Sequence, residues 1–163
     1  MKIAIISDTH DNLENLKRVL EKIKQEGVNI ILHCGDVASK ETLNFLFQNF
    51  KGRVYLVLGN MDKDYGLDKE NLEEFSQLEF SSDIKEIELE NKKIAFCHHP
   101  EIAQNLAKTQ KYDYVFYGHT HKPWIENIGE TKLINPGNVA GLFYRPSFAI
   151  CDLKTGKIEL KIL

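Results

Sequence analysis

The sequence predicts an α/β fold with α+β features, in which two mixed sheets lie face to face and helices flank them. In the first third of the chain, short apolar runs alternate with amphipathic stretches, which is typical of parallel strands joined by helices. Later, short strand-like segments follow one another, separated by turns rich in Gly, Asn and Pro. Because 163 residues suit one domain with its own core, we expect a single domain over residues 1–163.

The first part of the chain contains three predicted strands and two predicted helices in alternation. Residues 2–7 are apolar and largely β-branched, which suits a strand buried on both faces. Residues 30–33 and 54–58 repeat this pattern. Residues 12–26 and 40–50 carry apolar side chains at helical spacing. In the first of these helices the apolar positions are Leu13, Leu16, Val19, Leu20 and Ile23.

The second half of the chain changes to a mostly β pattern. We expect helices near residues 68–77 and over about 101–109. Strands are expected at residues 84–89, 92–97, 114–117, 124–128, 131–135, 147–152 and 157–162. The first two of these strands are separated by a short turn and therefore form a hairpin.

Charge and cysteine content narrow the class of protein. The net charge is −3, and cationic residues alternate with anionic ones on the predicted helices, so we expect no strong nucleic-acid binding. Cys34, Cys97 and Cys151 lie in apolar stretches without paired spacing, which indicates buried thiols in a reducing compartment. The apolar amino-terminal run is too short for a signal peptide, and no stretch could span a membrane. We therefore expect a cytoplasmic protein without membrane contact.

Residues of metal-ligand type follow the ends of several predicted strands. The motifs are Asp8-Thr9-His10, Gly35-Asp36, Gly59-Asn60, His98 and Gly118-His119-Thr120-His121. The carboxyl ends of parallel strands meet at one edge of a sheet, so Asp8, Asp36 and Asn60 are expected to lie close together. Two carboxylates, one amide and four imidazoles suit a pair of divalent ions. The ordered set predicts a metal-dependent hydrolase acting on phosphate esters.

The spacing within each motif suggests how the ligands reach the ions. If their segments are extended, Asp8 and His10 point to the same side, and so do His119 and His121. Asp36 lies on the middle one of three neighbouring loops, and its two carboxylate oxygens could bridge two ions. Two carboxylates against two divalent ions leave a residual charge of about +2, or about +1 with a hydroxide, which favours a phosphodiester monoanion.

The motifs taken together resemble those of the calcineurin-like metallophosphoesterases. The resemblance rests on Ser7-Asp8-Thr9-His10-Asp11-Asn12, Gly35-Asp36, Gly59-Asn60-Met61-Asp62, His98 and Gly118-His119-Thr120-His121. Length and the stretch Asn135-Pro136-Gly137-Asn138 are similar to the small, capless YfcE-like phosphodiesterases. The resemblance implies a metallo-dependent phosphatase-like fold, a four-layer αββα sandwich with a dinuclear site between the sheets. By the family's pattern Asp8, His10, Asp36 and His121 bind one ion, and Asp36, Asn60, His98 and His119 the other.

This resemblance also implies an activity. The chain would hydrolyse small phosphodiesters through a metal-held hydroxide, with Asp36 and Asn60 as catalytic residues that hold it. Mixed oxygen and nitrogen ligands accept Mn, Ni, Co, Zn or Fe, and Mn is the ion expected to support activity in vitro.

The chain departs from the superfamily's pattern at Met61, where many members have a histidine. A thioether cannot donate a proton to the leaving group, so no side-chain general acid is assigned. His99, beside His98, is a candidate replacement. Asp62 is expected to have a structural role in its loop, and His33 to be a satisfied core or surface residue.

Several other residues have two interpretations. Asn12 and Arg145 are candidates for contact with the phosphate, although Arg145 could equally be an ordinary surface residue. Phe143, Tyr144 and Trp124 could wall the site, but we expect them to pack in the core.

The sequence leaves two less favoured functions and an assembly state open. A retromer scaffold subunit has the same fold and works by protein binding with a compromised metal site, whereas this chain keeps the full ligand set. Nucleases of the superfamily bring capping or basic elements that this chain lacks. A homo-oligomer is compatible with such a small capless domain.

Overall fold

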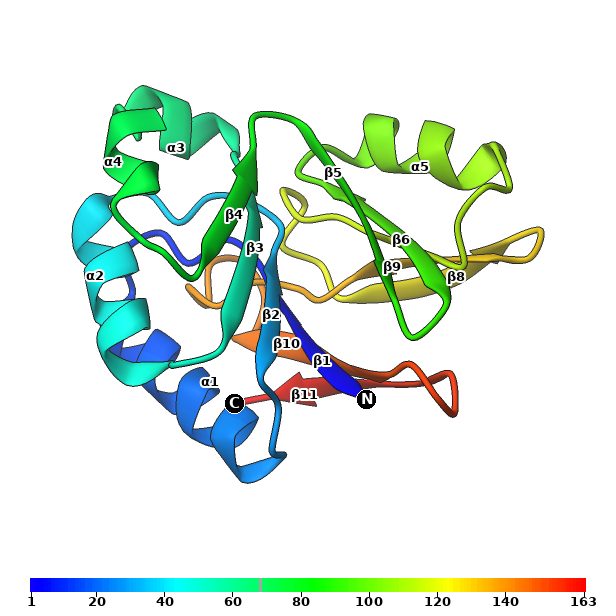
Figure 1. Cartoon of the computed structure of the whole chain (residues 1–163), viewed down its shortest axis with the longest axis horizontal. Coiled ribbons are helices and arrows are strands. Elements are labelled where there is room, and N and C mark those ends of the chain that lie inside the picture. The colour runs from blue at the N-terminus through cyan, green and yellow to red at the C-terminus, as the bar shows by residue number, and fades with distance from the viewer. Residues whose placement is uncertain (68) are drawn as a thin grey trace.

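The computed structural model describes residues 1–67 and 69–163. The elements in chain order are β1 (Lys2–Ile6), α1 (Leu13–Gln25), β2 (Ile30–His33), α2 (Lys40–Asn49), β3 (Arg53–Val57), α3 (Asn60–Asp64), α4 (Lys69–Glu73), β4 (Leu78–Ser81), β5 (Ile84–Leu89), β6 (Lys92–Cys97), α5 (Pro100–Lys108), β7 (Tyr114–Phe116), β8 (Trp124–Ile128), β9 (Thr131–Asn135), β10 (Ser147–Asp152) and β11 (Lys157–Ile162). Their arrangement is drawn in Figure 1.

The strands form two mixed sheets, as the sequence predicts. In the first sheet the order is β11-β10-β1-β2-β3-β4, where β1 to β4 are parallel and β10 and β11 join as an antiparallel hairpin beside β1. In the second sheet the order is β5-β6-β7-β9-β8, with a parallel centre and antiparallel edge strands. The carboxyl ends of the parallel strands carry the predicted ligand loops.

Alternation along the buried strands builds the layers. In β1, Ala4 and Ile6 pack against α1 and α2, whereas Ile3 and Ile5 pack against the second sheet. The outer face of the second sheet is covered by α5, where Ala103 packs with the β6 and β7 side chains. The result is the expected order of helices, sheet, sheet and helix, with α1 and α2 on one side and α5 on the other (Figure 1).

Three elements near the edge of the first sheet differ from the prediction. The helix expected near 68–77 is shorter: α4 ends at Glu73, and residue 68 lies outside the described residues. Residues 78–81 form β4, a strand that pairs in parallel with β3. β4 has only four residues, so pairing with β3 and not a long apolar pattern defines it. The single-turn helix α3 was also missed, because five residues are too few to show helical periodicity.

The three cysteines are buried thiols, as the sequence predicts. Cys34, Cys97 and Cys151 are free and buried; Cys34 lies between the sheets, and Cys97 lies under α5. No helix in the described part of the chain has the length and apolar character needed to cross a bilayer.

Candidate metal centre

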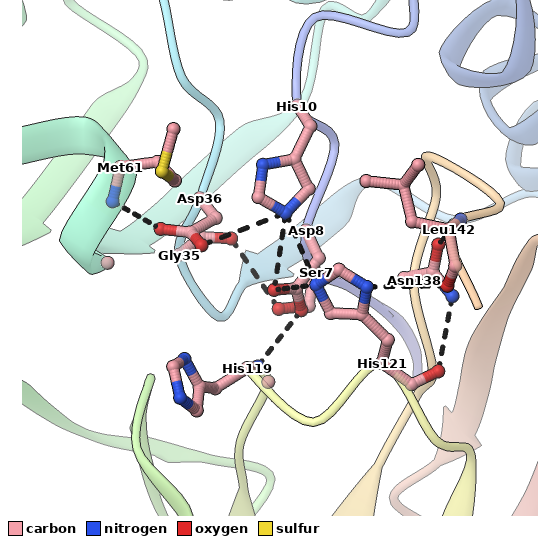
Figure 2. A network of polar contacts seen from close by, with 12 residues as sticks. Ser7, Asp8, His10, Gly35, Asp36, Met61, His119, His121, Asn138 and Leu142 are labelled. Carbon is pink, nitrogen blue, oxygen red and sulfur yellow. Dashed lines mark hydrogen bonds and ion pairs between the residues drawn. The ribbon is translucent and has the colours of Figure 1, made fainter. Parts of the chain in front are cut away.

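The seven predicted ligands gather at one edge of the two sheets. They follow β1, β2, β3, β6 and β7, six of them on loops and Asn60 at the start of α3, so ligands far apart in sequence meet where parallel strands end. Figure 2 shows the side chains of Asp8, His10, Asp36 and His121 directed toward one another.

The first ligand cluster consists of Asp8, His10, Asp36 and His121. Oδ1 of Asp8 lies 3.2 Å from Nε2 of His121 and 3.7 Å from Nε2 of His10. The two imidazole Nε2 atoms are 3.3 Å apart, and Nε2 of His10 is 3.7 Å from Oδ2 of Asp36. Ligands bonded to one ion at about 2.1 Å lie about 3.0–3.4 Å from each other. The separations between ligand atoms in this cluster are therefore close to those expected around one metal ion.

The second cluster consists of Asp36, Asn60, His98 and His119. Nε2 of His98 lies 3.3 Å from Oδ2 of Asp36, 3.2 Å from Oδ1 of Asn60 and 3.2 Å from Nδ1 of His119. His98 is buried, whereas Asn60 and His119 are exposed. The second cluster is therefore the side of the centre that faces solvent.

Unsatisfied atoms in the centre fit a cation. Oδ1 of Asp8 is buried and has no hydrogen-bond partner among the described residues. Nδ1 of His98 lies 2.8 Å from the carbonyl oxygen of Cys34 and must donate to it, so in the neutral ring Nε2 presents a lone pair to Asp36 and Asn60. Lone pairs facing one another across about 3 Å are favourable only with a cation or a proton between them. The donor set fits divalent metal ions.

The pKa values in the centre point to competition between protons and metal ions. Burial alone would raise the pKa of Asp8, but the neighbouring imidazoles of His10 and His121 hold it well below its usual range. The nearby carboxylate of Asp8 raises the pKa of His121. Burial lowers the pKa of His98, but the neighbouring carboxylate of Asp36 more than compensates and raises it. Protons thus occupy the metal-free rings of His98 and His121 more readily, and metal affinity is expected to fall as the pH falls.

The backbone of the ligand loops is not extended, contrary to our expectation. Five ligands have positive φ angles: Asp8 (53°), His10 (43°), Asp36 (56°), His119 (65°) and His121 (59°). Asp and His are among the residues that tolerate this left-handed region best. The paired side chains converge because the loops curl, and not because side chains alternate along a strand. Backbone strain of about 1 kcal/mol or more per residue is concentrated at this site.

Asp36 presents one oxygen to both clusters. Its Oδ1 accepts the N–H of Met61 at 2.9 Å, while Oδ2 faces His98 and His10. The bridge that we expected to use both oxygens would therefore run through Oδ2. A Cβ at Gly59 would collide with Oδ1 and the backbone of Asp36, so only glycine allows this close approach.

The buried carboxylate of Asp62 ties two ligand loops together. Oδ2 accepts the N–H groups of Asp36 (2.9 Å) and Gly59 (2.8 Å), and Oδ1 accepts the N–H of Ala38 (2.8 Å). Burial raises the pKa of Asp62 despite these three donors. The structural role predicted for Asp62 is confirmed.

Two asparagines of the stretch 135–138 support the histidine loop. Asn135 donates to the carbonyl of Gly118 (2.8 Å) and to Oγ1 of Thr120 (3.0 Å). Asn138 donates to the carbonyl of His121 (3.1 Å). In the sequence these two asparagines read as ordinary turn residues beside a Pro-Gly pair, and no local signal indicates their contacts with the histidine loop.

The remaining candidates are placed as follows. Asn12 caps α1: its Oδ1 accepts the N–H of Asn15, and its amide donates to the carbonyl of Ala140. Arg145 is exposed and has no ion pair with any described residue. The His99 ring is half-buried, with its centroid 5.0 Å from that of His98 and 4.8 Å from that of His119.

The expectation that three aromatic residues pack in the core is wrong. Phe143 is 92% exposed, Trp124 46% and Tyr144 44%. Tyr144 and Phe143 lie in the loop before β10, and Trp124 begins the edge strand β8, so neither segment has a layer over it.

His33 is a satisfied core residue and gives a test by pH. Its Nδ1 accepts the N–H of Gly35 (3.2 Å), so its Nε2 donates to Oγ1 of Thr9 (2.9 Å). Burial lowers the pKa of His33 from 6.5 to about 4. A depressed histidine pKa contributes stability above the unfolded value that is lost as the pH falls toward the folded value.

We expect His33→Gln to remove this pH dependence. When the pH falls from about 7.5 to 5, His33 should lower the free energy of unfolding of the metal-free wild type by about 2 kcal/mol. The variant should not show this loss. Urea denaturation at both pH values measures the difference in free energy of unfolding between wild type and variant. Contributions of the groups that both proteins share cancel in this difference. A difference that does not change with pH would contradict the expectation.

The chain is similar to known phosphodiesterases over most of its length. A model of the "Calcineurin-like phosphoesterase superfamily domain" matches residues 1–156. Phosphodiesterase MJ0936 of Methanocaldococcus jannaschii is 34% identical over 155 residues, 93% of each chain. Phosphodiesterase YfcE of Escherichia coli K12 is 29% identical over 153 residues, which cover 86% of this chain and 80% of YfcE. The solved structure of a novel archaeal phosphodiesterase matches 100% of both chains with a TM-score of 0.89 and 29% identity.

Proposed function

The chain belongs to the calcineurin-like phosphoesterase superfamily and is a metal-dependent hydrolase of ester bonds; from this premise we propose that it hydrolyses small phosphodiesters at a dinuclear centre. The observation that carries the proposal is the pair of ligand clusters that share Oδ2 of Asp36. If only one ion were bound, the lone pairs of the other ligand cluster would face one another with no cation between them. Two ions close together suit a substrate with one negative charge and two ester oxygens.

Each cluster has a distinct part in the proposed reaction. Asp8, His10, Asp36 and His121 would hold the buried ion, and Asp36, Asn60, His98 and His119 the ion nearer to solvent. Divalent ions there would lower the pKa of a bound water and polarise the phosphoryl oxygens. The residues supply fixed positions: Asp62 aligns the Asp36 loop, and Cys34 orients the His98 ring through its carbonyl. We assign no acid function to Met61, because a thioether carries no proton.

Metal identity and location are part of the proposal. The ligands accept Mn, Ni, Co, Zn or Fe, and we expect Mn²⁺ to support activity in vitro. The three free thiols favour a reducing compartment, which we take to be the cytoplasm. A protein-binding scaffold would have no need of seven converging ligands, so we prefer the enzyme.

The test is hydrolysis of bis(p-nitrophenyl) phosphate by chelator-stripped protein before and after Mn²⁺ is restored. We expect turnover only with metal, and a rise in the melting temperature of about 5–10 °C at Mn²⁺ concentrations near 100 times the dissociation constant. Binding isotherms should fit two ions per chain. No turnover with Mn²⁺, Ni²⁺, Co²⁺ or Zn²⁺ in folded protein would reject the proposal in favour of a scaffold.

His99 is proposed as the residue that assists departure of a poor leaving group. Its ring stands at the solvent-facing cluster, against His98 and His119. We expect His99→Ala to slow a diester with an alkyl leaving group by about 10²-fold and a p-nitrophenyl diester by much less, because nitrophenolate leaves without a proton. The kcat values of both substrates measure this. Gln104→Ala, an exposed position on the adjacent helix α5, is the control. Equal slowing of both substrates by His99→Ala would contradict the role.

A further inference from the structure

An exposed aromatic side chain stands beside the metal centre on a tightly built loop. Leu142, Phe143 and Tyr144 are 46%, 92% and 44% exposed, three consecutive large apolar residues outside the core. The Phe143 ring lies against the imidazole of His121, with centroids 5.7 Å apart and planes at 47°. A single exposed apolar residue needs no explanation, but one in contact with a predicted ligand does.

The backbone holds Phe143 in a strained conformation. Its φ is 63°, a region that bulky side chains rarely adopt. The N–H of Tyr144 donates to the carbonyl of Leu142 at 2.7 Å, two residues earlier, so Phe143 occupies the centre of a γ-turn with positive φ. This form of γ-turn is rare and strained. Glycine would relieve the strain, yet the position carries a phenyl ring.

Asn138 and His121 fix the loop that carries this turn. The buried Oδ1 of Asn138 accepts the N–H groups of Gly141 (2.5 Å) and Leu142 (2.9 Å), while its amide donates to the carbonyl of His121. The carbonyl of Leu142 lies 3.4 Å from Nδ1 of His121 (Figure 2). The same residue that is predicted to bind metal therefore anchors the turn, and the Phe143 ring has a set position relative to His121.

We propose that Phe143 forms a stacking subsite for a flat aromatic substituent of the phosphodiester, either an aryl group or a nucleobase. The inference rests on the proposed function and names its substrate class. An aryl group is joined to the phosphate through one ester oxygen and a nucleobase through a sugar, so either ring stays near the phosphate, and Phe143 lies against His121, a predicted ligand of the ions. Ring stacking is tolerant of ring identity, so the subsite selects flat substituents over alkyl ones without selecting a base.

Binding of two phosphonates to Mn²⁺-loaded protein tests the subsite. Phenylphosphonate and methylphosphonate have the same anionic head group and differ in the ring. We expect wild type to bind the phenyl compound about 10-fold more tightly, and Phe143→Ala to bring the ratio of dissociation constants close to 1. Phe143→Tyr should keep the preference, and Phe143→Leu should keep little of it. Ile162→Ala, which removes an exposed apolar side chain from β11, is the matched control and should not change the ratio.

Stability gives a second readout that does not depend on metal. Phe143→Gly should raise the melting temperature of metal-free protein by about 2–6 °C, because glycine adopts positive φ without strain. A ring that merely stabilised the loop by packing would give the opposite sign.

The outcomes separate this inference from the proposed function. Equal ratios in wild type and Phe143→Ala, in a protein that hydrolyses bis(p-nitrophenyl) phosphate, would overturn only the subsite. If light scattering also showed that Phe143→Ala dissociates an oligomer, the ring would belong to a contact between copies. Failure of wild type to hydrolyse any diester would overturn the proposed function itself.

Discussion

Replacing Asp36 with asparagine is expected to lower kcat/KM for bis(p-nitrophenyl) phosphate by about 10³-fold. Oδ2 of Asp36 faces both ligand clusters, at 3.3 Å from Nε2 of His98 and 3.7 Å from Nε2 of His10. The amide either turns N–H groups toward the ions or presents a neutral oxygen, so the centre loses one of its two negative charges. Steady-state kinetics with Mn²⁺ measure the loss.

The same variant should lose most of the melting-temperature rise that Mn²⁺ gives to wild type, because ion binding stabilises the native state in proportion to affinity. Asp64→Asn is the matched control: Asp64 is exposed on α3, close in sequence but outside the centre. Full metal stabilisation together with full activity in Asp36→Asn would contradict the shared-ligand arrangement.

Replacing Asp62 with alanine is expected to lower the free energy of unfolding by about 3–5 kcal/mol. The carboxylate is fully buried and accepts three backbone N–H groups, from Asp36, Ala38 and Gly59. Alanine leaves all three without an acceptor, and each buried N–H costs about 1–3 kcal/mol. Urea denaturation of metal-free protein measures the change.

Asp64→Ala on the same short helix separates this effect from helix propensity and should shift stability by less than about 0.5 kcal/mol. Asp62→Asn keeps one acceptor oxygen and should fall between alanine and wild type. A loss below about 1 kcal/mol in Asp62→Ala would mean that water or a backbone rearrangement satisfies the three donors.

Most strand positions and the grouping of the candidate ligands were predictable because they depend on local patterns and chain direction. The buried apolar runs define the strands, and chain direction brings the residues after β1, β2 and β3 to one edge. Asp8, Asp36 and Asn60 could therefore be grouped without a structure. The four-layer order required the family resemblance, because amphipathicity alone does not say which sheet face a helix covers.

The features that the sequence could not predict depend on contacts between loops. Asp8 and His121 have positive φ angles in loops that pack against other loops. The alternation of side chains along an extended strand therefore could not predict how these two residues converge. A short edge strand such as β4 is defined by its partner and not by its own four residues. Phe143 was expected in the core because hydrophobic residues usually lie there, and no local signal distinguished its turn.

The position of β1 has a consequence for how the chain folds. β1 lies between β2 and β10, with Lys2 opposite Asp152, so one of its two pairings spans nearly the whole sequence. Such non-local pairing raises contact order and slows folding. During synthesis, β1 keeps an open edge until β10 leaves the ribosome, and an unpaired edge is a site for aggregation. A chaperone that binds the nascent chain would therefore protect β1 for most of its synthesis.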